Sequence, residues 1–284
     1  MTKEIKLLDG TKLSNLGIGS WKMGDSFSKR KEELESIKYA LDNGIKLIDT
    51  AEMYGNGNSE KLIGEAIKGY DRDDLFLVSK VLPSNAGKEY IFKSCENSLK
   101  RMKIDYLDLY LLHWRGNTPL KETEECMIKL IKDGKIKRWG VSNMDIDDME
   151  EIMGLSTENS CMVNQVLYHL GSRGIEFSLK PYTDKNNIIT MAYCPIAQAG
   201  KLREKLLSSV SIIKVSKKYN ISPVQVLLSY IMTKENTVSI PKSSQLVHMK
   251  EIVDCKNIIL LEEDIKILES EFPKPIKKVP LDVE

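Results

Sequence analysis

Short apolar stretches alternate along the chain with longer stretches in which apolar residues recur at helical spacing. The short stretches are rich in β-branched and aliphatic residues, which is typical of β-strands. The eight strand candidates are Leu16–Trp21, Ile45–Thr50, Leu75–Lys80, Tyr106–His113, Ile136–Asn143, Met162–His169, Ile188–Cys194 and Thr237–Ser243. Helices are expected between them, for example at Lys31–Gly44, Lys88–Lys103, Leu120–Lys135 and Ser222–Lys234.

This alternation of strand and helix predicts one closed (β/α)8 TIM barrel, with residues 1–284 forming a single domain. A doubly wound parallel sheet is the main alternative, but the strand count is high for that fold and its phosphate-binding loop is missing. Two Gly-x-Gly motifs, Gly17–Gly19 and Gly55–Gly57, do not continue into the dinucleotide-binding fingerprint. We therefore expect these glycines to be turn residues.

Composition narrows the classes of partner. Lys and Arg total 42 against 41 Asp and Glu, so the charge balance gives no reason to expect nucleic acid or an anionic membrane. The five cysteines are far apart and form no CxxC pair, which favours reduced thiols in a core. The N-terminal stretch carries acidic residues where a signal peptide is apolar, and no apolar run approaches membrane length. A cytoplasmic protein is expected.

Metal ligands are not grouped in the sequence. The only histidines, His113, His169 and His248, lie in three separate segments, and no cluster of His, Cys and carboxylate residues has ligand spacing. No metal cofactor is expected.

Ionisable residues stand at the ends of three consecutive strand candidates. Asp49, Lys80 and His113 each occur where an apolar run ends, and Tyr54 follows in the loop after the first of these runs. In a barrel of this kind the active site lies at the carboxyl ends of the strands, so these side chains are predicted to share one cavity. A single strand-end Asp is more often a helix cap and a single Lys is usually solvated, but four such residues together favour a catalytic site.

The four residues are suited to proton transfer. An adjacent ammonium favours the phenolate form, so Lys80 is expected to lower the pKa of Tyr54 from its usual value of about 10. Asp49 would pair with Lys80 and fix its direction, and His113 would hydrogen-bond a substrate oxygen. Tyr54 is therefore the candidate general acid.

The chain resembles the aldo-keto reductase superfamily over essentially its whole length. The similar segments occur in the order that the family has, and the hairpin-like segment Glu4–Leu13 resembles the one that closes the barrel floor. They are IDTAEMYGNGNSEKLIGEAI, LVSKV, DLYLLHWRG, GKIKRWGVSN, VNQVLYH, AYCPIAQAGKL and SIPKSS. By this resemblance Asp49, Tyr54, Lys80 and His113 match the catalytic tetrad, and the reaction is carbonyl reduction by a nicotinamide cofactor bound without a Rossmann domain.

The resemblance also implies a set of cofactor residues. Ser142, Asn143 and Gln165 match the residues that bind the nicotinamide amide, and Tyr193 matches the ring that stacks on the nicotinamide. The others implied are Gly19, Ser20, Trp21 and Asp49 near the nicotinamide and ribose, Cys194, Pro195, Ile196, Gly200 and Leu202 along the pyrophosphate, and Lys242, Ser243, Ser244, His248 and Glu251 around the 2′-phosphate and adenosine.

Two of these positions depart from the family pattern. Many members carry Arg where this chain has His248, and Asn where it has Ile252. A charged Lys242 and the hydroxyl of Ser243 suit a phosphate monoester. NADP(H) is therefore the expected cofactor, and NAD(H) is the alternative.

The expected substrate is a small carbonyl compound, held by Trp21, Met23, Tyr54, His113 and Trp114 at the mouth of the pocket. Two other functions stay open at this point. A Schiff-base lyase would use Lys80 as nucleophile and needs a lysine of depressed pKa. A regulatory subunit of the same fold would bind cofactor without turnover. A monomer or weak dimer is expected.

Overall fold

The computed structural model describes residues 3–155 and 161–283, and in these ranges an eight-stranded parallel sheet closes into a barrel. The strands run in the order β10-β9-β8-β7-β6-β5-β4-β3. Their bounds are β3 Ile18–Gly19, β4 Leu47–Asp49, β5 Phe76–Val81, β6 Leu109–Leu112, β7 Trp139–Ser142, β8 Val163–Leu167, β9 Ile189–Tyr193 and β10 Thr237–Ser239. The sheet closes where the Gly17 amide donates to the Ser239 carbonyl (2.8 Å) and the Ser239 amide to Asn15 (2.9 Å). The predicted (β/α)8 barrel is confirmed.

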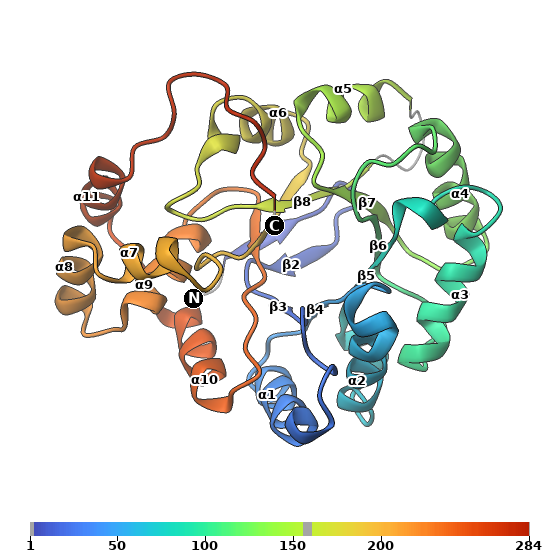
Figure 1. The fold of residues 1–284 in the computed structure, drawn as a ribbon, viewed down its shortest axis with the longest axis horizontal. Helices are drawn as coiled ribbons and strands as arrows, with labels where there is room; N and C mark the ends of the chain where they lie inside the picture. The colour runs from blue at the N-terminus through green and yellow to red at the C-terminus, as the bar shows by residue number, and fades with distance from the viewer. Residues whose placement is uncertain (1–2, 156–160, 284) are drawn as a thin grey trace.

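Helices surround the barrel as an outer ring (Figure 1). They are α1 Arg30–Asp42, α2 Asn58–Ala66, α3 Ile91–Met102, α4 Leu120–Lys132, α5 Ile146–Leu155, α6 Leu179–Lys185, α7 Lys201–Leu207, α8 Val210–Tyr219, α9 Pro223–Met232, α10 Leu246–Asp254 and α11 Glu262–Glu271. Helix α9 begins with a full capping box, in which the Ser222 hydroxyl accepts from the Gln225 amide and the Gln225 side chain accepts from the Ser222 amide. The helix expected at Ser222–Lys234 therefore begins where its sequence predicts.

An antiparallel hairpin, β1 Glu4–Lys6 and β2 Lys12–Ser14, closes one end of the barrel, as the resemblance implied. Its apolar side chains Ile5, Leu7 and Leu13 join a buried cluster with residues that begin the barrel strands, among them Leu47, Phe76, Leu109, Val163 and Ile189. The hairpin therefore covers the amino ends of the strands, and the carboxyl ends lie at the opposite end of the barrel.

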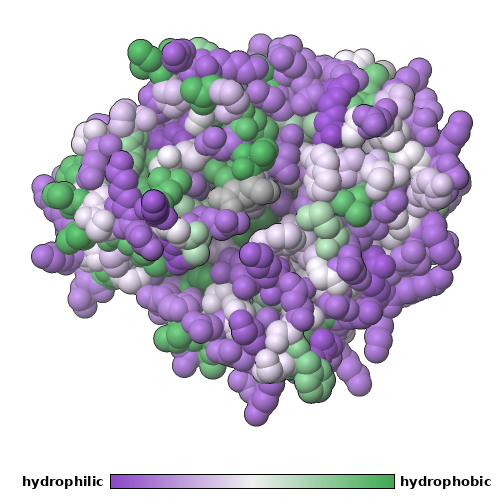
Figure 2. Space-filling view, viewed as in Figure 1, coloured by the Kyte–Doolittle hydropathy of each residue, from purple (hydrophilic) through white to green (hydrophobic). Residues whose placement is uncertain are grey.

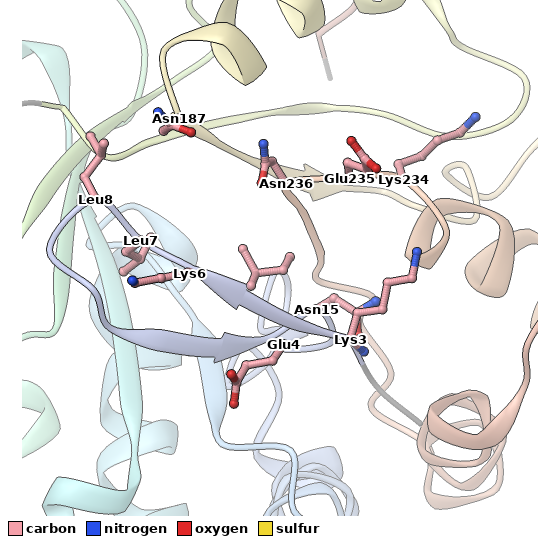
Figure 3. A pocket seen from close by; sticks show the side chains of 11 residues that line it. Lys3, Glu4, Lys6, Leu7, Leu8, Asn15, Asn187, Lys234, Glu235 and Asn236 are labelled. Carbon is pink, nitrogen blue, oxygen red and sulfur yellow. Dashed lines mark hydrogen bonds between the residues drawn. The ribbon is translucent and has the colours of Figure 1, made fainter.

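A cavity of about 550 Å3 lies beside this hairpin. Figure 3 shows Lys6 of the hairpin and the adjacent Lys3 on one side of it, and Asn236 and Glu235 on the other. Because the cavity is at the closed floor, it is separated by the barrel interior from any site at the carboxyl ends of the strands.

The glycines of the two Gly-x-Gly motifs have different roles. Gly55 and Gly57 have φ angles of +57° and +85°, so they are turn glycines as expected. Gly17 and Gly19 instead border and form β3, where a Cβ atom would collide with the Leu47 side chain or lie 3.1 Å from the Ile240 carbonyl oxygen. The expectation of a turn was wrong for this pair, because close strand packing requires them.

Candidate active site

Three adjacent strands bring the predicted acid–base residues together at the open end of the barrel. Asp49 ends β4, Lys80 is the last but one residue of β5, and His113 directly follows β6. β4 pairs with β5 and β5 with β6, all in parallel, so the carboxyl ends of the three strands are neighbours. The structure therefore places these three side chains at one rim, with Tyr54 beside them.

Lys80 is the centre of the group and has no solvent exposure. Its ammonium donates to the Asp49 carboxylate (2.7 Å), the Thr50 carbonyl oxygen (2.9 Å) and the Tyr54 phenol oxygen (3.1 Å). An ammonium has three N–H donors and no acceptor, so these three partners use all of them. Burial lowers the pKa of Lys80, but Asp49 and Tyr54 outweigh it and the pKa is raised.

Tyr54 must accept this hydrogen bond, because an ammonium can only donate. Its own O–H is thereby directed away from Lys80 and available to another acceptor. Burial raises the pKa of Tyr54 more than the Lys80 charge lowers it. The expected net lowering of this pKa was therefore wrong, and the phenol holds its proton at neutral pH.

His113 is a neutral ring next to the phenol. Burial, reinforced by the Lys80 charge, lowers the pKa of His113 to about 3. Its Nδ1 is buried without a hydrogen-bond partner among the described residues. The ring centroids of His113 and Tyr54 are 5.8 Å apart. A neutral imidazole has one N–H donor, so His113 can hydrogen-bond a substrate oxygen near Tyr54.

A buried chain of hydroxyl groups lies behind this group. The Ser20 hydroxyl donates to the Asp49 carbonyl oxygen (2.9 Å) and accepts from the Ser59 hydroxyl (2.7 Å), while Thr50 donates to Ser59 (3.1 Å). Ser20, implied as a cofactor residue, is only 1% exposed, so its side chain supports the backbone of β4. Ser59 and Thr50 were missed from the sequence, because isolated hydroxyl residues carry no distinctive pattern.

The predicted nicotinamide-binding residues are neighbours: Ser142, Gln165 and Tyr193 lie on β7, β8 and β9, and Asn143 directly follows β7. The Tyr193 phenol donates to the Asn143 side-chain oxygen (2.9 Å), and the Asn143 amide donates to the His113 carbonyl oxygen (3.2 Å). Gln165 donates to Asp49 (2.8 Å), and Ser142 donates to the Gln165 carbonyl oxygen (2.8 Å). Polar amide groups therefore lie directly beside the Asp49 carboxylate.

The segment expected along the pyrophosphate follows β9. Cys194 has a φ of +49°, which turns the chain sharply away from the strand. Pro195 and Ile196 come next in this turn, and Leu202 is exposed on α7. Gly200 has a φ of +138°, and no described residue lies within 4 Å of a Cβ atom added there. An open glycine leaves the backbone accessible to a ligand.

Lys242 lies near other lysines. Burial lowers the pKa of Lys242, and the charges of Lys29 and Lys22 lower it further, although Glu33 opposes them. Lys22 and Lys29 belong to the loop between β3 and α1, and the Ser36 hydroxyl of α1 donates to the Ser243 carbonyl oxygen (2.9 Å). Ammonium groups that repel one another are stabilised by a nearby anion. The sequence analysis did not predict that Lys22 and Lys29 lie near Lys242, although both are basic residues that follow the first strand candidate.

The other residues expected around the 2′-phosphate and adenosine contact residues that are close to them along the chain. Ser243 bonds the backbone of Gln245 in both directions, and His248 Nδ1 lies 3.2 Å from the Glu251 carboxylate. Ser244 stands between Ser243 and α10. Ile252, which replaces a common Asn, is buried in the core. Among the residues that the resemblance implied around the 2′-phosphate and adenosine, only Lys242 carries an ammonium group.

The residues expected to hold substrate divide into two groups. Trp21 and Trp114 are 40% and 37% exposed, and each ring packs on the central group, Trp21 on Tyr54 and Trp114 on His113, with centroid distances of 4.8 Å. Met23 is 1% exposed and belongs to the main core, so its side chain is covered. Figure 2 shows hydrophobic residues gathered around the hollow near the middle of a mostly hydrophilic face.

Three further findings bear on the sequence predictions. The five cysteines, all in the described residues, form no disulfide bonds. Among residues 3–155 and 161–283, no group of three or more His, Cys, Asp or Glu side chains is arranged to hold a metal ion. In the same ranges no helix has both the length and the apolar character needed to cross a membrane.

Comparison with known proteins gives consistent relatives. The family model described as Aldo/keto reductase family matches residues 15–271. The chain is 43% identical to methylglyoxal reductase YeaE of Escherichia coli, over 99% of both chains, and 35% identical to glyoxal reductase of Bacillus subtilis, over 92% of this chain and 90% of that one. It also resembles a crystal structure of an aldo/keto reductase from Klebsiella pneumoniae in complex with NADP and acetate, with 41% identity, full coverage of both chains and a TM-score of 0.96.

Proposed function

Because the chain belongs to the aldo/keto reductase family, and is an NADP-dependent oxidoreductase that reduces carbonyl groups, we propose that its substrates are small 2-oxoaldehydes. The observation that carries the proposal is the hydrogen bond that the buried Lys80 ammonium donates to Tyr54. This bond directs the phenol O–H away from Lys80. Two indole rings flank the rim at which this happens. The relatives named for methylglyoxal and glyoxal support the same substrate class.

In this proposal Tyr54 donates the proton that the substrate oxygen takes up during reduction. The phenol is protonated at neutral pH, since burial raises its pKa. Lys80 stabilises the phenolate left behind, and Asp49 keeps Lys80 charged and oriented. His113 orients the substrate oxygen as a neutral donor.

When bound, NADPH supplies the hydride that adds to the carbonyl carbon. Lys242, with Lys22 and Lys29 nearby, would hold its phosphates, and Ser142, Asn143, Gln165 and Tyr193 would surround its nicotinamide. Trp21 and Trp114 would exclude water from one side of the substrate and limit its size, which favours a small dicarbonyl compound.

The two other functions are less consistent with the residues. A Schiff-base lyase needs a neutral Lys80, but Asp49 and Tyr54 raise its pKa. A regulatory subunit would need no proton donor at this rim. Cytoplasmic location and a monomer or weak dimer stay predictions from the sequence.

Loss of NADPH absorbance with methylglyoxal, glyoxal and propanal tests the proposal. Propanal has the length of methylglyoxal without the second carbonyl group. We expect kcat/KM to be at least about tenfold higher for methylglyoxal than for propanal, and Tyr54→Phe to lower it by roughly 10²–10⁴ with NADPH binding retained. Equal rates for the two aldehydes would contradict the substrate class, and an active Tyr54→Phe variant would contradict the proton donor.

A further inference from the structure

The turn that carries Tyr54 is tied to the segment that follows Lys80 by an acidic side chain. We propose that Glu52 is a positioning residue for the reaction, which holds the Tyr54 phenol against the Lys80 ammonium. This inference rests on the proposed role of Tyr54 as proton donor.

The backbone after Tyr54 adopts an unusual conformation. Gly55, Asn56 and Gly57 have φ angles of +57°, +52° and +85°, so three consecutive residues adopt the left-handed region. Glycine loses more conformational freedom on folding than any other residue, and Asn tolerates this region better than most. The turn therefore needs fixed contacts nearby if the phenol is to stay in place.

Glu52 supplies such contacts before Tyr54. Its carboxylate oxygen Oε1 accepts from the Leu82 amide (2.7 Å) and from the Asn85 side-chain amide (3.0 Å). Its own backbone amide donates to the Lys80 carbonyl oxygen (3.3 Å). Hydrogen bonds to an ionised acceptor are roughly twice as strong as neutral ones.

These contacts join the two chain segments whose side chains must meet. Leu82 is two residues beyond Lys80, just past the end of β5, and Tyr54 is two residues beyond Glu52. Glu52 is half-buried, and its carboxylate bonds are to Leu82 and Asn85, so it acts on the phenol through the backbone. The distance that it controls is the 3.1 Å between the Tyr54 oxygen and Lys80 Nζ.

The test compares Glu52→Ala, which removes the acceptor, with Glu52→Gln, which keeps a carbonyl oxygen, and with Asn85→Ala, which removes one donor. Glu122→Ala is the matched control, because the Glu122 carboxylate also accepts from a loop amide, that of Lys88 (3.0 Å), on helix α4. For each variant we would measure kcat and KM with methylglyoxal, the Kd of NADPH, the melting temperature and the pH profile of kcat.

We expect kcat of Glu52→Ala to fall about tenfold to a hundredfold, since a displacement of about 1 Å can cost a hundredfold. The Kd of NADPH should stay within about twofold, and Glu52→Gln and Asn85→Ala should keep most of the activity. The alkaline limb of the profile should move to higher pH in Glu52→Ala, because a phenol that is farther from the ammonium loses its acidifying partner.

A kcat within about twofold of wild type, a loss matched by Glu122→Ala, or an unmoved alkaline limb would each overturn the role of Glu52. These outcomes differ from failure of the proposed function, in which the wild-type protein would not reduce methylglyoxal or Tyr54→Phe would stay active.

Discussion

At Lys242 a single side chain has to distinguish two cofactors that differ by one phosphate. If its ammonium binds the 2′-phosphate, Lys242→Met should weaken NADPH binding about tenfold to a hundredfold, since a hydrogen bond to a charged group contributes roughly 1.5–3 kcal/mol. NADH binding should change by less than about twofold. Quenching of tryptophan fluorescence gives both dissociation constants.

Lys250→Met is the control for this measurement, because Lys250 is an exposed cation on helix α10, which follows the segment that contains Lys242. Equal losses for both cofactors in Lys242→Met would refute the phosphate contact. His248→Arg should widen the preference for NADPH, since a guanidinium stays charged and can bind phosphate with two donors.

The sequence predicted the positions of the four central residues better than it predicted the pKa of Tyr54. Asp49, Lys80 and His113 could be found because each ends an apolar run, and parallel strands bring such positions together. The raised pKa of Tyr54 could not be predicted from the sequence, since it depends on how far the surrounding chain buries the phenol. The role proposed for Glu52 could not be predicted either, because its partners Leu82 and Asn85 follow the next strand.

Among the elements, helices α2 and α3 are in contact at a glycine. A Cβ atom added at Gly64 of α2 would lie 2.5 Å from the Met102 carbonyl oxygen at the end of α3. Helix propensity alone favours Ala over Gly by about 1 kcal/mol. We expect Gly64→Ala to destabilise the protein by a net of roughly 1–3 kcal/mol, because overpacking a rigid backbone contact outweighs propensity.

Gly154→Ala offers a matched comparison on helix α5, where no described residue lies within 4 Å of the added atom. This variant should gain about 0.5–1 kcal/mol. Urea unfolding of both variants measures the two changes. If Gly64→Ala were as stable as wild type, the helices would have to move apart without cost.

Element boundaries were predicted less well than element types. Within the expected strand Leu16–Trp21, β3 covers only Ile18–Gly19, and Gly17 pairs with Ser239 where the barrel closes. The chain leaves the sheet after Gly19, where the Ser20 hydroxyl bonds the Asp49 carbonyl oxygen. The strand expected at Tyr106–His113 is reduced to Leu109–Leu112. An apolar run marks burial, but the number of residues that pair depends on the neighbouring strand.

For the whole molecule, buried histidines link stability to pH. Burial lowers the pKa of His169 to about 4, partly offset by Asp282, and that of His113 to about 3. A group with a depressed folded-state pKa stabilises the protein above its unfolded pKa of about 6.5, and this stability is lost as the pH falls towards the folded value.

The free energy of unfolding should therefore fall by about 2 kcal/mol for each buried histidine as the pH is lowered from 7.5 to 5. His169→Asn keeps an acceptor for the Gly171 amide, which now bonds His169 Nδ1 (3.1 Å), and removes the titrating ring. Urea unfolding should show that the free energy of unfolding differs between the two pH values by about 2 kcal/mol less in this variant than in the wild type. An unchanged difference would mean that the pKa of His169 is the same in the folded and unfolded states.

The hairpin and the C-terminal segment lie at opposite ends of the barrel. The hairpin packs under the amino ends of the strands, while Asp282 bonds Ser172 after β8 and Lys278 lies 3.4 Å from Asp145 after β7. In an immobilised form of the protein, the exchange of substrate and product would therefore depend on the point of attachment. Coupling through exposed Lys6 of the hairpin would turn the mouth away from the support, whereas coupling through Lys278 would turn the mouth towards it and slow the exchange of substrate and product.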